Sequence, residues 1–212
     1  MRAPFKQLSG QFLLDPDAYL LSANNRPTMA FTWKGSTFNI YGAVSKMMAA
    51  ATYLLSYYTW VNTTSLLTIQ RPEETTLSTK EKWYQMPVFK RRAFRVITLR
   101  FGDYGQLSIP KYSLEFFTLL LKVSCIIVRY WAEDTPPGLL VTTRHGKAAP
   151  LRSGELTCFN KFIRDNFGLR DDKGVSLKTS LCSRMLSLSW QIKPNTAKIR
   201  SRQNVAEKKC WG

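Results

Sequence analysis

The chain has 212 residues, of which 31 are basic and 14 acidic, so its formal net charge is +17 with the single histidine neutral. Hydrophobic residues make up 44% of the sequence and aromatic residues 13%, a composition that supports a hydrophobic core and excludes disorder over most of the length. The four cysteines form no CxxC pair, which argues against a disulfide or zinc scaffold and suits a reducing compartment.

The first 28 residues contain three prolines and two short apolar patches. We predict that residues 1–28 form an extended arm, which packs either on its own domain or on a neighbouring copy because it cannot bury itself. No long apolar run of the secretory type follows the N-terminus, so we expect an intracellular protein that is not secreted.

Residues 29–192 are predicted to form one α+β core domain, and residues 193–212 a basic flexible tail. The apolar periodicity of the core domain indicates two or three helices packed on a mixed or antiparallel sheet. The predicted elements, in chain order, are a hairpin at 30–40 around a Lys34-Gly35 turn, a helix at 43–59, a short strand at 65–69, a polar connection at 71–82, a strand at 90–101, a helix at 112–130, a strand at 139–143, a helix at 153–167 and two alternating segments at 175–181 and 186–192.

Two apolar stretches, residues 42–61 and 114–131, approach the ~20 residues that a membrane-spanning helix needs. The first has its apolar residues on one face of a helix. In the second, Glu115, Lys122 and Arg129 recur every seven residues and therefore form one narrow polar stripe. We expect both to be helices of a folded core, the second the most buried, and no transmembrane segment. Residues 126–128 of the second stretch are all β-branched, so a strand at 125–131 is the alternative there.

The residues of catalytic chemistry are few. His145 is the only histidine, and Cys158 lies thirteen residues further on, so a Cys–His nucleophile pair can be written. Cys158 adjoins the apolar face of the predicted helix, where a small cysteine is usually a packing residue. No set of metal ligands, phosphate-binding glycine loop or nucleophile elbow is present. We therefore expect no enzymatic activity, metal or cofactor, and a small Cys/His hydrolase is the remote alternative.

Basic residues are concentrated in two clusters. Residues 82–100 contain six cations and no acid, and residues 193–209 contain six cations and one acid. Such clusters attract RNA, DNA or an acidic lipid surface. Aromatic residues among the cations could stack on bases or enter a membrane, but Phe89 and Phe94 are better explained as core residues. The candidate polyanion-binding residues are Lys82, Lys90, Arg91, Arg92, Arg95, Lys198, Arg200 and Arg202.

Over residues 30–192, the size, basic balance and order of elements resemble the matrix proteins of negative-strand RNA viruses, particularly those of rhabdoviruses. The stretch from Phe31 to Tyr58 is similar to the strand-then-helix opening of that domain. The resemblance implies a non-enzymatic assembly protein that self-associates through an arm, condenses ribonucleoprotein and lies on the inner face of the virion. The PPxY and PTAP-like motifs and the lysine-rich N-terminus of that family are missing.

We therefore expect a structural protein that binds RNA or ribonucleoprotein, an acidic membrane surface, or both. It would form homo-oligomers through its N-terminal arm and act on no small-molecule substrate. The alternative is a component of an organellar ribosome, whose arm and tail would thread into RNA.

Overall fold

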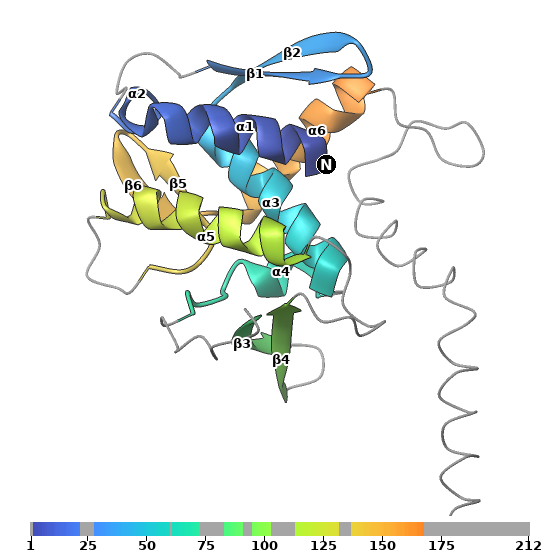
Figure 1. The fold of residues 1–212 in the computed structure, drawn as a ribbon, viewed down its shortest axis with the longest axis vertical. Coiled ribbons are helices and arrows are strands. Elements are labelled where there is room, and N and C mark those ends of the chain that lie inside the picture. The colour runs from blue at the N-terminus through green and yellow to red at the C-terminus, as the bar shows by residue number, and fades with distance from the viewer. Residues whose placement is uncertain are drawn as a thin grey trace, which may run out of the picture.

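A computed structural model of the chain describes residues 2–21, 28–59, 61–72, 83–90, 95–102, 113–131 and 137–167; between residues 83 and 102 it describes the side chains at positions 87, 88, 96 and 98. Figure 1 shows the arrangement. The elements are α1 (Arg2–Leu14), α2 (Pro16–Leu20), β1 (Thr28–Trp33), β2 (Ser36–Tyr41), α3 (Ala43–Thr59), α4 (Thr63–Leu66), β3 (Trp83–Lys90), β4 (Arg95–Gly102), α5 (Ser113–Val128), β5 (Val141–Arg144), β6 (Lys147–Pro150) and α6 (Ser153–Phe167).

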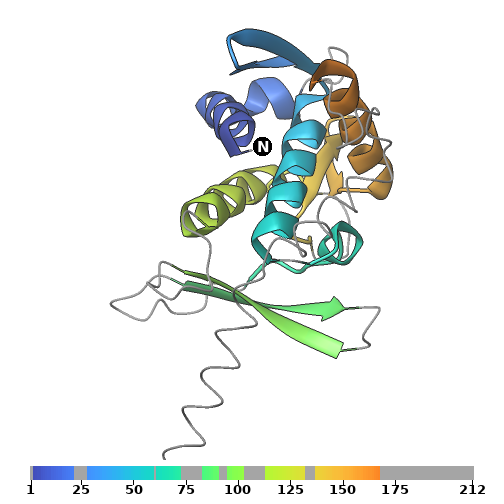
Figure 2. The same ribbon diagram turned by 90° about the vertical axis from the view of Figure 1, so that its right-hand side faces the viewer.

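Helix α3 forms the centre of the core, and it lies between α5 and α6 in Figure 2. The helix confirms the prediction at residues 43–59, including its buried apolar face. Eleven of its 17 residues are buried, against seven of 16 in α5, so the prediction that α5 is the most buried helix was wrong. The reason is the run of three alanines at 49–51, all fully buried, whose small side chains let neighbouring elements approach α3 on several sides.

The described strands form three antiparallel hairpins, β1–β2, β3–β4 and β5–β6. This confirms the α+β class and the hairpin predicted at residues 30–40. The β1–β2 turn places Lys34 at φ +48° and Gly35 at φ +80°, and the β5–β6 turn places His145 at +50° and Gly146 at +74°. Two consecutive positive φ values define the tight hairpin loop that matches strand twist, and glycine adopts the second one without a steric cost.

The predicted extended arm at residues 1–28 is wrong, because most of it is helical. In α1, Phe5, Leu8 and Phe12 lie three and four positions apart and are all buried, so this face belongs to the core. Pro4 falls in the first turn, where a missing N–H costs little. Asp15 then accepts a hydrogen bond from the Ala18 N–H and caps α2.

Two glutamines of α1 complete the outer edge of strand β1. The amide of Gln7 donates to the Thr32 carbonyl and accepts from the Thr32 N–H, at 3.1 and 2.8 Å. Gln11 makes the same pair of bonds with Ala30. Because alternate residues of an edge strand leave their polar groups unpaired, these amides take the place of a third strand. The apolar residues of the predicted arm thus pack against their own chain, and its glutamines form hydrogen bonds there. Self-association stays a prediction.

Three other predicted elements need correction. The short strand at 65–69 is wrong, since Asn62 caps the helical turn α4 there. The alternative strand at 125–131 is wrong, because α5 continues to Val128. The strand at 90–101 starts at Arg95, and Lys90 instead ends the preceding strand β3, which the proline at position 87 concealed in the sequence.

The helices predicted at 112–130 and 153–167 are confirmed, as is the strand at 139–143, which occupies residues 141–144 and pairs with β6. Residues 73–82, the segments at 175–181 and 186–192, and the tail at 193–212 lie outside the described residues. In the ranges that are described, no helix combines the length and hydrophobicity needed to cross a membrane.

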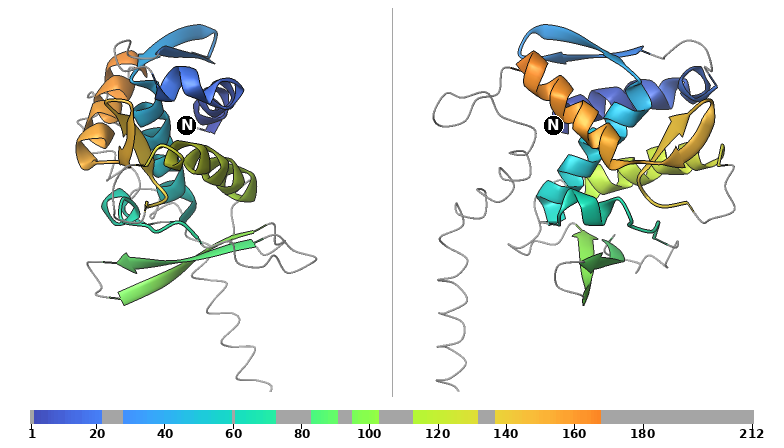
Figure 3. Two further views of the ribbon diagram at one scale, coloured as in Figure 1. Left: turned by 90° about the vertical axis from the view of Figure 1, so that its left-hand side faces the viewer. Right: turned by 180° about the vertical axis from the view of Figure 1, so that it is seen from behind.

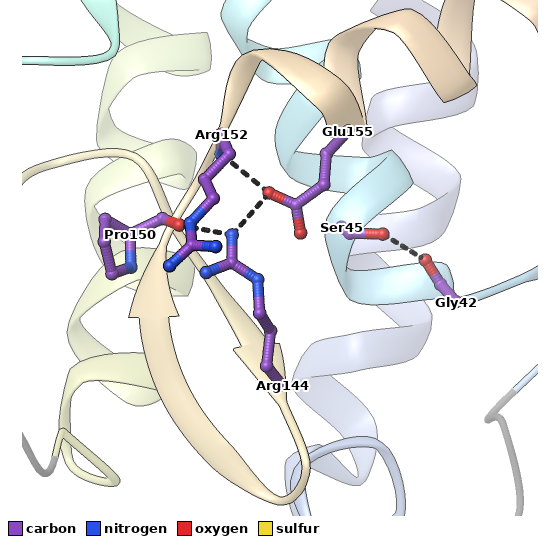
Figure 4. Close-up of polar contacts among 6 residues, drawn as sticks. All are labelled: Gly42, Ser45, Arg144, Pro150, Arg152 and Glu155. Atoms are coloured by element: carbon purple, nitrogen blue, oxygen red, sulfur yellow. Dashed lines mark hydrogen bonds and ion pairs between the residues drawn. The ribbon is translucent and has the colours of Figure 1, made fainter.

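Arg144 fastens the β5–β6 hairpin to the first turn of α6 (Figure 4). Its Nη2 donates to the Glu155 carboxylate at 2.9 Å and to the Pro150 carbonyl at 2.7 Å. The same Glu155 oxygen accepts from the Arg152 N–H at 2.7 Å, which satisfies one of the donors that a helix start leaves free. Both charged side chains are about three-quarters covered, so one carboxylate stabilises the hairpin, the helix start and their junction.

We expect Glu155→Ala to lower the free energy of unfolding by about 1.5–3 kcal/mol. The substitution leaves the partly buried Arg144 guanidinium without its carboxylate and removes a cap from the start of α6. Asp165→Ala on the same helix breaks a more exposed ion pair with Arg164 and should cost less than about 1 kcal/mol. Urea unfolding of the two variants makes the comparison. Equal losses would show that Glu155 has no special role.

Candidate polyanion-binding surface

Part of the first basic cluster lies at one end of the β3–β4 hairpin. Lys90, the last residue of β3, is the cross-strand partner of Arg95, the first residue of β4. The six residues from Lys90 to Arg95 include four cations and no acid. Arg91 and Arg92 in this segment lie outside the described residues, as do the other predicted site residues, namely Lys82, Lys198, Arg200 and Arg202.

This hairpin has one covered and one open face. Val88 is 3% exposed and belongs to the core, whereas Val96 is 62% exposed, and Pro87 and Thr98 are also exposed. The hairpin lies at one end of the molecule, and its Lys90 end is on the same side of α3 as α6 (Figures 2 and 3). Like charges at directly opposed strand positions are destabilising, so a Lys90–Arg95 pair favours a partner that supplies negative charge.

Within the described ranges, acidic side chains neutralise little of the positive charge. The described residues include fifteen basic and five acidic ones. Three of the acids form ion pairs, Glu115 with Lys6, Glu155 with Arg144 and Asp165 with Arg164. The other two, Asp15 and Asp17, accept hydrogen bonds from the Ala18 N–H and the Tyr130 hydroxyl.

Several cations therefore face solvent without a described carboxylate paired to them. Six of them are exposed and form no ion pair with any described residue: Lys34, Lys122, Arg129, Lys147, Arg152 and Lys161. They belong to the β1–β2 turn, α5 and its end, β6, the residue before α6 and α6 itself. Sequence reasoning selected none of them as a binding residue, since outside the dense clusters a single cation gives no local signal.

The residues considered for catalysis lie on the surface. His145 occupies the β5–β6 turn and is exposed. Cys158 is also exposed, which corrects the expectation that it packs in the core: it lies on the side of α6 away from the buried Leu156 and Phe159. Among the described residues, no three His, Cys, Asp or Glu side chains lie close enough to hold a metal.

The Tyr130 hydroxyl donates a hydrogen bond to the Asp17 carboxylate and so joins the end of α5 to α2. This bond, together with desolvation and the negative charge of Asp17, raises the pKa of Tyr130 above its ordinary value of 10.0, although the positive charge of Arg129 opposes the shift. The bond requires the protonated phenol. Its stabilising contribution is therefore complete below the unfolded pKa and disappears as the pH rises through the folded pKa.

We expect wild type to be more stable than Tyr130→Phe at neutral pH, and the difference to vanish as the pH rises from about 9 to about 12. The Phe variant keeps the ring but lacks the bond at every pH. Denaturant unfolding across this range measures the gap. A difference independent of pH would show that the hydroxyl does not act through this bond.

No protein family model, curated protein or solved structure matches the chain.

Proposed function

We propose that this protein is a non-enzymatic RNA-binding protein that holds the sugar–phosphate backbone through cationic surfaces, chiefly at the Lys90–Arg95 end of the β3–β4 hairpin. The observation that carries the proposal is that all five described carboxylates are engaged within the chain. Most cations of the described residues are thus left for an external partner, and phosphates supply the matching density of negative charge.

The placement of the cluster supports the same function. Two paired strands with one face on the core hold Lys90 and Arg95 at the end of a hairpin. The end of a hairpin can reach the backbone of an extended polymer. The assembly role implied by the viral matrix resemblance is compatible with this binding but is not needed for it.

The test compares two polyanions at about 0.15 M salt. One is a fluorescent single-stranded RNA of about 20 nucleotides, longer than the ~4–16 that a single-strand-binding domain covers, and the other is a phosphatidylserine vesicle. We expect saturable binding to the RNA and weaker flotation with the vesicles. Binding to the vesicles alone would replace the proposal with a membrane function, and binding to neither would refute it.

A further inference from the structure

Helix α5 carries a continuous exposed stripe outside the proposed hairpin site. The exposed positions along it are Glu115, Thr118, Lys122 and Cys125, followed by Arg129 one residue beyond the helix end. They recur at intervals of three and four residues, so they lie in one row along the helix. The sequence predicted this stripe, and the structure shows it facing away from the core.

Arg71 adds a third cation to this row. Its Nη2 donates a hydrogen bond to the Cys125 Sγ at 2.8 Å, which places the guanidinium beside the helix between the levels of Lys122 and Arg129. Arg71 lies 54 residues before Cys125, so only the tertiary structure brings it here. Lys122 and Arg129 are about 10.5 Å apart along the helix axis.

In the described part of the chain, the acids near the row are already engaged. Glu115 lies 3.0 Å from the Lys6 ammonium, so its charge is neutralised at the start of the stripe. Asp17 accepts the Tyr130 hydroxyl, and it makes no ion pair with Arg129 among the described residues. Arg71, Lys122 and Arg129 therefore present three positive charges over a straight, rigid length of ~10.5 Å.

We infer that the Arg71–Lys122–Arg129 row is a second nucleic-acid contact, which binds the phosphates of one RNA strand laid along α5. A strand of B-DNA carries a phosphate every ~3.4 Å along the helix axis, so the row of ~10.5 Å is long enough to contact more than one phosphate of a nucleic-acid strand. A lipid bilayer fits less well, because the row exposes Thr118 and Cys125 but no large apolar side chain that could enter the membrane.

This inference rests on the proposed RNA-binding function and extends it to another face of the molecule. Helix α5 lies on the opposite side of α3 from α6, whereas the Lys90 end of the hairpin is on the α6 side (Figure 2). The two contacts can therefore be tested separately.

Two exposed cysteines allow the RNA contact to be located by protection of their thiols from alkylation. Cys125 lies in the row, and Cys158 lies on α6. The test uses the full chain with Cys182 and Cys210 replaced by serine, and measures alkylation of each remaining thiol by N-ethylmaleimide. At an RNA concentration tenfold above its Kd about one protein in eleven is free, so we expect alkylation of Cys125 to slow about tenfold and that of Cys158 to stay unchanged.

Charge variants provide the second test. Arg71→Gln, Lys122→Gln and Arg129→Gln together should weaken binding of the single-stranded RNA about a hundredfold at about 0.1 M salt and reduce the salt slope by about two. The control carries Lys34→Gln, Lys147→Gln and Lys161→Gln, which removes the same charge elsewhere and should have less than a tenfold effect. Circular dichroism verifies that both variants are folded.

The outcomes separate this inference from the function on which it rests. RNA binding that leaves Cys125 as reactive as before, or equal losses in the two triple variants, overturns the α5 contact and leaves the hairpin proposal standing. A wild-type chain that binds no RNA refutes both. Protection of Cys125 by phosphatidylserine vesicles but not by RNA overturns the assignment of the row to nucleic acid.

Discussion

Replacing Phe12 with alanine should lower the free energy of unfolding by about 3–5 kcal/mol, as is usual when a buried phenylalanine is truncated. Phe12 has no exposed surface and packs in the core from α1. Small proteins have unfolding free energies of about 5–15 kcal/mol, so this loss would be a large part of the total. It follows directly from the finding that the N-terminal segment is a core helix.

Leu14→Ala is the matched control, because Leu14 lies in the same helix and is 87% exposed. This variant should change stability by no more than about 0.5 kcal/mol. Urea unfolding of both, followed by far-UV circular dichroism, makes the comparison. Similarly small losses of stability in both variants would contradict the packing of α1 in the core and favour the extended arm predicted from the sequence.

Neutralising the hairpin cluster should have the largest effect on binding. A chain with Lys90, Arg91, Arg92 and Arg95 all replaced by glutamine loses four charges from one end of the β3–β4 hairpin. Four phosphate contacts correspond to a several-hundredfold loss of single-stranded RNA affinity at about 0.1 M salt. The hairpin itself should be no less stable, because the substitutions relieve repulsion between opposed cations.

The control for this variant replaces Lys34, Lys147, Lys161 and Arg164 with glutamine and so removes the same four charges from other surfaces. We expect its RNA affinity to fall less than about tenfold, since it weakens only the overall field. Fluorescence anisotropy with the RNA measures both. Equal losses would mean that total charge, and not the hairpin, determines binding.

The sequence predicted the elements whose side-chain pattern is long and regular. The helices at residues 43–59, 112–130 and 153–167 each have an apolar face of several turns, and the β1–β2 hairpin has a Lys-Gly turn that fixes its loop. The polar stripe of α5 was also visible, because a spacing of seven residues keeps charges on one side of a helix.

The elements that were missed depend on contacts distant in the sequence or on short signals. Helix α1 has its buried face in the sequence, but Pro4 and Gly10 conceal it, and Gln7 shows its role only beside the edge of β1. Strand β3 contains Pro87 and is supported by its pairing with β4. Helix α4 has four residues, too few for periodicity to show.

The candidate site was predictable in part for the same reason. Dense charge reveals the 90–95 cluster without knowledge of the fold, because no acid interrupts it. The α5 row combines Lys122 of α5 and Arg129, one residue beyond the helix end, with Arg71 from a distant segment. Such a row exists only in three dimensions, and the pairing of Glu115 with Lys6 at the start of the stripe is equally invisible in the sequence.

The salt dependence of RNA affinity in the wild-type chain tests the central claim most directly. Seven cations, four in the hairpin cluster and three along α5, predict a slope of about −5 for log affinity against log salt, which is about a thousandfold loss between about 0.1 and 0.4 M. An affinity that changes less than about threefold over this range would contradict binding through uncompensated positive charge.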